Sequence, residues 1–262
     1  MTTEEAEAPT EGVPPDDTMT LTEHLAELRV RIIRAALAVL IAMVLIVVFY
    51  DPILAFLVQP YENLCASRGA DFCDPELFIT APAEGLQTRL RVGMYGGIIV
   101  ALPVILWQVW RFIVPALHAK EKRYAIPFVL SSVTLFLVGG VLAYFTVERA
   151  LEFLIAWAGE DVNEIFTVSS YVSLLGLMVF AFGIGFLLPV LLVFLQLVGV
   201  VTARQLLRGW RYAIVAIFVV AAVITPSGDP ITLLMLAGPM MLLYFLAALL
   251  GWLVMRRRTP PS

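Results

Sequence analysis

The sequence predicts an all-α integral membrane protein with six transmembrane helices, and its composition and apolar runs support this fold class. Of the 262 residues, 61% are apolar and 15% are charged, and the mean hydropathy is +0.92. An ordinary soluble domain has about 45–50% apolar and about 25% charged residues, so this apolar surplus cannot be covered in a soluble core of this length. The composition excludes a soluble enzyme, and the net charge of −4 provides no global basic field for nucleic acid.

Six apolar segments along the chain are the predicted transmembrane helices. A bilayer core about 30 Å thick needs about 20 mostly apolar residues in a helix. The fourth segment is longer than this and contains Pro189, so we expect it to tilt, bend or extend beyond the bilayer. We expect the fifth and sixth helices to be short, with a turn rich in Pro and Gly at 225–230 between them. The predicted spans are 32–50, 92–110, 125–146, 171–201, 212–224 and 231–254.

The distribution of Lys and Arg predicts the direction of these spans. Loops that stay in the cytoplasm are enriched in basic residues. Thirteen of the 17 basic residues flank one set of span ends, whereas the other four lie on the opposite side with twelve Asp and Glu residues. We therefore expect a multi-pass protein of the inner (cytoplasmic) membrane with both termini in the cytoplasm. The thirteen are Arg29, Arg31, Arg34, Arg111, Lys120, Lys122, Arg123, Arg204, Arg208, Arg211, Arg256, Arg257 and Arg258.

The two ends of the chain differ in composition from its apolar middle. Residues 1–18 are acidic and rich in Pro and Thr without apolar periodicity, so we expect a disordered tail. Residues 19–255 are expected to form a single six-helix transmembrane domain, and residues 256–262 a basic cytoplasmic tail. We do not expect a cleavable signal peptide, because the first apolar span is longer than the apolar region of such a peptide.

The segment that leads into the first span contains a candidate binding residue, Glu27. Thr20 and Glu23 have the spacing of a capping box, which predicts that a helix begins here in the cytoplasm. Glu27 and Arg31 are four residues apart, so they can form an ion pair on one face of that helix. From these residues alone two interpretations stay open. Glu27 stabilises an interfacial helix, or it presents a carboxylate at the membrane surface to a basic ligand.

The loop between the second and third spans contains a second candidate, Glu121. It is the one acidic residue among Lys120, Lys122 and Arg123. A solvated loop whose cations set the topology explains the basic residues, with Glu121 as their counter-charge. This interpretation explains less well the amphipathic run at 112–117 that precedes the acid.

The two cysteines of the chain, Cys65 and Cys73, fall in the first predicted outer loop. In an oxidising compartment this location favours a structural disulfide. On the chain-entropy model, closing so short a loop would stabilise the fold by about 2–3 kcal/mol. Two cysteines cannot supply a four-ligand metal site, and we expect neither a metal nor a cofactor.

Ionisable groups are absent from the depth of the predicted spans. Between their ends the six spans contain no Asp, Glu, Lys or His, and the chain has no HExxH, G-x-S-x-G or P-loop motif. Ion-coupled transporters and intramembrane hydrolases usually place ionisable groups at depth. The sequence therefore favours a non-enzymatic binding protein without catalytic residues. A small-solute permease stays open as the alternative.

Several short motifs occur in a fixed order along the predicted helices. They are His24-Leu25-x-Glu27-Leu28-Arg29-x-Arg31, Pro103-Val104-Ile105-Leu106-x-Gln108-x-Trp110, Phe112-Ile113-x-Pro115-Ala116-Leu117, Glu121-x-Arg123, Ala143-Tyr144-Phe145, Phe182-Gly183, and Thr225-Pro226 followed by Asp229. In this order, from about residue 21 to residue 256, the chain resembles the TatC family. TatC is the signal-peptide-receptor subunit of the twin-arginine protein translocase.

The resemblance implies a receptor for folded proteins that carry an N-terminal signal with two consecutive arginines. Glu27 and Glu121 match the two glutamates of the family's receptor patch, with Arg29 and Phe112 nearby in the motifs. Carboxylates suit such a ligand because they accept paired, charge-assisted hydrogen bonds from a guanidinium group. The resemblance further implies single-span partners of the TatA and TatB types, self-association in a translocase complex in the lipid bilayer, and export driven by the proton-motive force.

Two positions depart from the family's pattern. Leu187 stands in the fourth span where many members have Glu or Gln. Leu233 follows a turn that is one residue longer than in relatives, at a position that is polar in some of them. Roles of polar groups at these two positions are therefore not transferred to this sequence.

Overall fold

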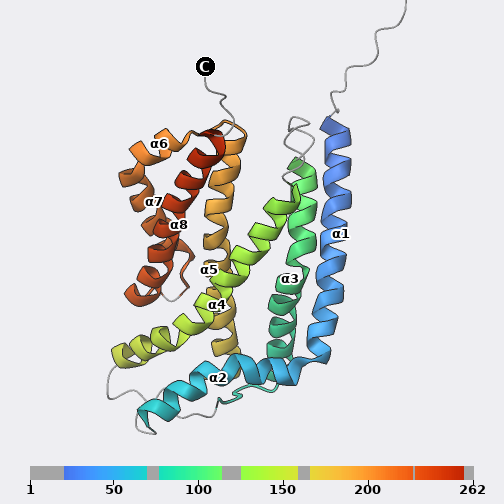
Figure 1. Cartoon of the computed structure of the whole chain (residues 1–262). Coiled ribbons are helices and arrows are strands. Elements are labelled where there is room, and N and C mark those ends of the chain that lie inside the picture. Colours follow the sequence, from blue (N-terminus) through green and yellow to red (C-terminus); the bar gives the residue numbers. More distant parts are fainter. Residues whose placement is uncertain (1–20, 70–76, 114–124, 159–165, 227, 257–262) are drawn as a thin grey trace, which may run out of the picture.

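A computed structural model describes residues 21–69, 77–113, 125–158, 166–226 and 228–256 of the chain. This part of the protein is almost entirely α-helical (Figure 1), with an isolated bridge between Phe78 and Thr167. The helices are α1 (Leu21–Val48), α2 (Tyr50–Arg68), α3 (Glu84–Ile113), α4 (Ala125–Ala158), α5 (Val168–Leu197), α6 (Ala203–Arg208), α7 (Trp210–Ile224) and α8 (Pro230–Arg256).

Five of these helices are long and apolar enough to cross a membrane, so the protein is a membrane protein. They are α1, α3, α4, α5 and α8, whereas α7 is a shorter apolar helix of 15 residues. Each predicted span thus corresponds to a helix. The prediction of a short sixth helix is wrong, because α8 has 27 residues against 28 in α1. It is longer than expected because Pro230 suits the first helical position and the helix continues past the apolar run to Arg256.

Close contacts at glycines hold the long helices together. α1 runs along α3, and α4 packs against α5 (Figure 1). A Cβ atom on Gly97 of α3 would lie 2.8 Å from the backbone nitrogen of Met43 in α1. A Cβ atom on Gly139 of α4 would lie 2.6 Å from the backbone oxygen of Phe182 in α5. Only glycine permits these approaches, which is how small residues bring membrane helices into contact.

Helix α2 lies across the far ends of α3 and α5, away from the start of α1 (Figure 1). Two tyrosine hydroxyls donate hydrogen bonds to its backbone. The Tyr144 hydroxyl lies 2.8 Å from the Phe56 oxygen, and the Tyr171 hydroxyl lies 2.7 Å from the Leu57 oxygen. These bonds fix α2 to α4 and α5. The helix α2 was not predicted from the sequence, because polar residues and prolines interrupt its apolar positions.

The turn between α7 and α8 contains the predicted motif residues Pro226 and Asp229. Asp229 is buried, and its Oδ1 accepts a hydrogen bond of 2.7 Å from the backbone N–H of Thr232. Asp229 therefore caps the N-terminus of α8. Pro226 is exposed and follows Thr225, whose hydroxyl donates to the Ala221 oxygen at the end of α7.

Candidate functional site

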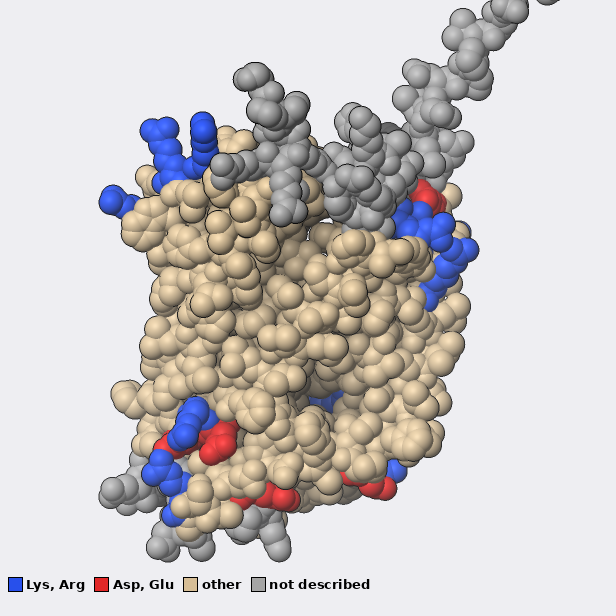
Figure 2. All heavy atoms as spheres, in the orientation of Figure 1, with Lys and Arg blue, Asp and Glu red and all other residues tan. Residues whose placement is uncertain are grey.

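Arginine side chains gather at one end of the molecule, which we name the basic end. The start of α1, the end of α3, α6 and the end of α8 lie there (Figure 1). Figure 2 shows basic side chains at this end, and it shows most of the acidic side chains, together with some basic ones, at the opposite end. Among the described residues, the arginines near these helix ends and at the start of α7 are Arg29, Arg31, Arg34, Arg111, Arg204, Arg208, Arg211 and Arg256.

Glu27 lies in the second turn of α1 and is paired with an arginine. The Arg31 Nη2 donates a hydrogen bond to the Glu27 Oε1 one helical turn away, and the two groups form an ion pair. The Glu27 side chain is 27% exposed, whereas the Arg31 side chain is 11% exposed. Arg29, two residues after Glu27, is exposed. The ion pair expected from the spacing is therefore present, and the Glu27 side chain is partly exposed although its Oε2 atom is buried.

A pocket of about 400 Å³ lies between the first turns of α1 and the end of α3. We name it the Glu27 pocket. Three guanidinium groups and one carboxylate line it, so its charge is positive although a carboxylate lies in it. Its residues are Ala26, Glu27, Val30, Arg31 and Arg34 of α1, and Arg111 of α3.

The end of α3 is anchored by Trp110. This side chain is 2% exposed, and its ring centroid lies 4.4 Å from that of Phe128 in α4 and 5.4 Å from that of Phe194 in α5. Phe112, a predicted site residue, is half-buried just after this anchor. Glu121 lies outside the described residues, so its proximity to Glu27 stays a prediction.

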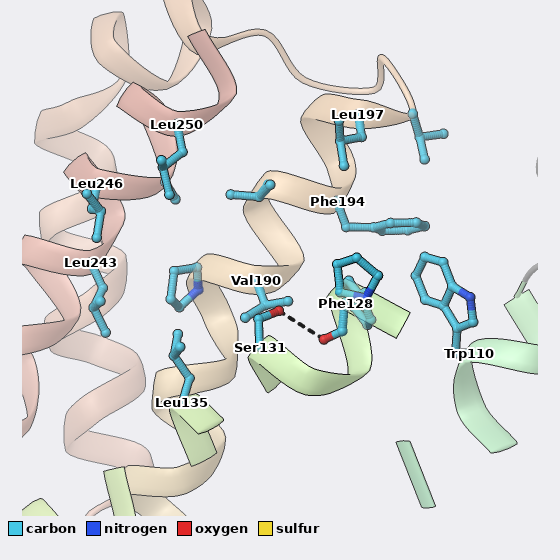
Figure 3. Close-up of a pocket in the computed structure, with 15 residues that line it drawn as sticks. Trp110, Phe128, Ser131, Leu135, Val190, Phe194, Leu197, Leu243, Leu246 and Leu250 are labelled. Atoms are coloured by element: carbon cyan, nitrogen blue, oxygen red, sulfur yellow. Dashed lines mark hydrogen bonds between the residues drawn. The ribbon is translucent and has the colours of Figure 1, made fainter. Parts of the chain in front are cut away.

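An apolar groove of about 400 Å³ lies between α3, α4, α5 and α8 (Figure 3). In Figure 3, leucines of α8 lie on one side and the aromatic rings around Trp110 on the other. The Ser131 hydroxyl in the groove donates to the Phe128 oxygen at 3.0 Å, so it does not offer its proton to a ligand. The groove is lined by Trp110, Pro127, Phe128, Ser131, Leu135, Pro189, Val190, Val193, Phe194, Leu197, Val198, Leu243, Leu246, Ala247 and Leu250.

Cys65 is buried in α2 and is disulfide-bonded. Its predicted partner Cys73 lies outside the described residues, so the pairing itself stays a prediction. Among the described residues, no three His, Cys, Asp or Glu side chains lie close enough together to hold a metal ion.

Arg34 and Arg111 were not predicted as parts of the candidate site, and the apolar groove was not predicted either. Both arginines were interpreted only as indicators of topology, although each stands at the boundary of an apolar run on neighbouring spans. That shared position could have indicated that they lie close together. The groove left no comparable signal, because its residues come from four helices and are apolar like the rest of each helix.

Comparisons with known proteins agree with this arrangement. A family model of the Sec-independent protein translocase protein TatC matches residues 23–239. TatC of Frankia casuarinae is 40% identical over 248 residues, which cover 92% of this chain and 68% of that protein. TatC of Aquifex aeolicus is 38% identical over 243 residues, which cover 92% and 98%. A crystal structure of the twin-arginine translocase receptor TatC matches with a TM-score of 0.70 at 37% identity, covering 88% of this chain and 99% of that one. The chain belongs to the TatC family of Sec-independent protein translocase proteins.

Proposed function

We propose that this protein is the receptor subunit of a twin-arginine translocase and binds the arginine pair of signal peptides at its basic end. The main supporting observation is the pairing of Glu27 with Arg31. The carboxylate already binds one guanidinium group, and the Glu27 side chain as a whole is 27% exposed, so we expect an incoming arginine to exchange with Arg31. Arg29 and Phe112 flank this carboxylate in the family motifs, and Glu121 would add a second carboxylate.

The apolar groove supports the same proposal. A signal peptide combines a positively charged segment with a following apolar segment of about 7–15 residues. Trp110 lines the groove and the next residue, Arg111, lines the Glu27 pocket. One peptide can therefore place its arginines near Glu27 and its apolar segment in the groove.

The orientation belongs to the proposal as well. With the arginines of the basic end in the cytoplasm, both termini are cytoplasmic, and α7 completes a set of six spans in the inner membrane. Residues 1–18 and 256–262 are then cytoplasmic tails of a single six-helix domain. Single-span TatA- and TatB-type proteins would join the receptor for proton-motive-force-driven export, and copies of the chain would associate within that complex.

The alternative of a small-solute permease is not favoured. The family is one of protein translocase components rather than of enzymes or permeases. Gln196, a buried polar residue of α5, donates to the Ala247 oxygen of α8 at 3.1 Å and so contributes to helix packing.

Peptide capture tests the arginine site. The purified full-length protein is presented with a signal peptide that contains Arg-Arg and with its Lys-Lys counterpart. We expect the Arg-Arg peptide to bind better, and Glu27→Gln and Glu121→Gln each to weaken it about tenfold, since hydrogen bonds to charged groups contribute about 1.5–3 kcal/mol. The control Glu62→Gln, which removes an exposed carboxylate of α2, should leave capture unchanged. Equal capture of both peptides would remove the receptor assignment.

Photo-crosslinking from the apolar segment of the same peptide tests the groove. Val193→Trp fills the groove and should reduce crosslinking to α5 and α8 several-fold. The matched control is Leu191→Trp on the same helix, because Leu191 is 52% exposed and does not line the groove. If both variants crosslink like the wild type, the apolar segment binds elsewhere.

A further inference from the structure

The lining of the Glu27 pocket has more positive charge than a receptor for arginines requires. Arg31 is paired with Glu27, whereas Arg34 and Arg111 add two further guanidinium groups to the lining. Two arginines would repel the ligand that Glu27 is proposed to bind, so their presence calls for a second, anionic ligand.

Arg31 offers a further donor toward such a ligand. Its side chain is 11% exposed, and its Nε is buried without a hydrogen-bond partner. A buried donor without a partner destabilises the fold, and a phosphate oxygen that reached it would satisfy it. Arg31 lines the same pocket as Arg34 and Arg111.

The pocket lies toward one end of two candidate membrane spans, where we expect phospholipid phosphates to lie. The membrane-spanning parts of α1 and α3 are Leu25–Val48 and Glu84–Phe112, so Arg34 and Arg111 stand near the same ends of both spans. Beside the pocket, α1 exposes Ile33 at 47% and Leu37 at 52%. These apolar side chains can contact the acyl chains of a lipid whose phosphate is in the pocket.

We propose that the Glu27 pocket binds the phosphate headgroup of an anionic phospholipid between α1 and α3. Arg34 and Arg111 supply paired N–H groups to the phosphate oxygens, and the Arg31 Nε donates a further bond. Arginine suits this role because its planar group matches phosphate in two-bond geometry. Basic pockets between transmembrane helices on the cytoplasmic side bind anionic headgroups in this way. The headgroup would lie beside the Glu27 carboxylate. The charge argument rests on the proposed function, but the lipid experiment uses no signal peptide, so the two proposals can fail separately.

Native mass spectrometry of the full-length protein tests this site. The protein is incubated with phosphatidylglycerol or with zwitterionic phosphatidylcholine of the same chain length. We expect the protein to retain phosphatidylglycerol in clear preference to phosphatidylcholine. The double variant Arg34→Gln/Arg111→Gln should reduce its affinity at least tenfold, because each arginine near the membrane surface contributes about fivefold. The matched control is Arg208→Gln/Arg211→Gln, which removes the same charge from α6 and α7 and should change the affinity less than twofold.

Three outcomes would overturn the proposal. One is equal retention of the two lipids, and another is an equal loss in the control variant, which would indicate attraction to the whole basic end. The third is displacement of phosphatidylglycerol by inorganic phosphate at about 10 mM, because the pocket would then bind free phosphate. If the double variant does not fold, Arg34→Lys/Arg111→Lys keeps both charges, and the expected result is a several-fold loss through the missing paired geometry.

Discussion

Arg31 occupies the carboxylate that an incoming arginine would need. The pair joins Glu27 and Arg31 across one turn of α1, at the edge of a pocket where Arg34 and Arg111 repel cations. A ligand with one arginine gains little by exchanging with Arg31, because it replaces one ion pair by an equivalent one. A ligand with two arginines can form a second contact, so under the proposed function we expect the internal pair to favour ligands with two arginines.

Arg31→Gln is therefore expected to raise capture of the Arg-Arg peptide about twofold. An ion pair at this helical spacing contributes about 0.3–0.5 kcal/mol, and its loss removes Arg31 as a competitor for the Glu27 carboxylate. Equilibrium binding of the labelled peptide to purified protein measures the effect, with Arg208→Gln as a control for the lost charge. A decrease on Arg31→Gln alone would mean that Arg31 contributes to the bound state instead of competing with it.

At the scale of single helices, the α4–α5 pair depends on Gly139. A Cβ atom there would lie 2.6 Å from the Phe182 oxygen, which is backbone and cannot move aside easily. Apart from its chain neighbours and its own helix backbone, Gly85 in the first turn of α3 has no atom within 4 Å of such a Cβ atom. Both glycines are helical, but their packing environments are opposite.

Gly139→Ala should destabilise the protein by about 1–3 kcal/mol, as overpacking in tight interiors does. Gly85→Ala should leave the stability unchanged or raise it by up to about 1 kcal/mol, because alanine is the better helix former. Thermal unfolding in detergent, followed by tryptophan fluorescence, compares the two. An equal decrease in both midpoints would show that α4 and α5 do not approach each other this closely.

At the scale of the whole molecule, the helices are not all long enough to cross the hydrocarbon core of a bilayer. α7 has 15 residues, which rise about 22 Å, less than a hydrocarbon core of about 30 Å. The turn from α7 to α8 is nearer to the basic end than α2 is (Figure 1). If α7 spans the membrane, we expect a mismatch of this size to be accommodated by thinning of the adjacent bilayer, by flanking side chains that reach the interface or by oligomerisation.

The orientation gives a prediction at the same scale. With the basic end in the cytoplasm, Glu62→Cys on α2 should react with a membrane-impermeant maleimide in intact cells. Arg208→Cys on α6 should react only after the inner membrane is permeabilised. Both positions are exposed, so accessibility within the protein does not decide the result. The reverse pattern would place the basic end outside and remove the proposed receptor site.

The sequence predicted the elements that depend on apolar length and missed those that depend on tertiary contacts. Every predicted span corresponds to a helix, because runs of apolar residues have few alternatives in a bilayer. The helix α2 depends on bonds from Tyr144 and Tyr171 on distant helices, and the apolar groove depends on four helices together. Glu27 was predicted with its Arg31 partner, since that pair is local. Arg111 was missed as a pocket residue because its neighbours are about 80 residues away in the chain.

The attachment of α2 has a mechanical consequence. Hydroxyl bonds to α2 from α4 and α5 tether these two helices at the end remote from the arginines. A helix of 30 residues such as α5 is about 45 Å long, so a rotation of about 5° about the tethered end shifts its other end by about 4 Å. Small tilts of α5 about its tethered end would therefore widen or narrow the apolar groove between α5 and α8.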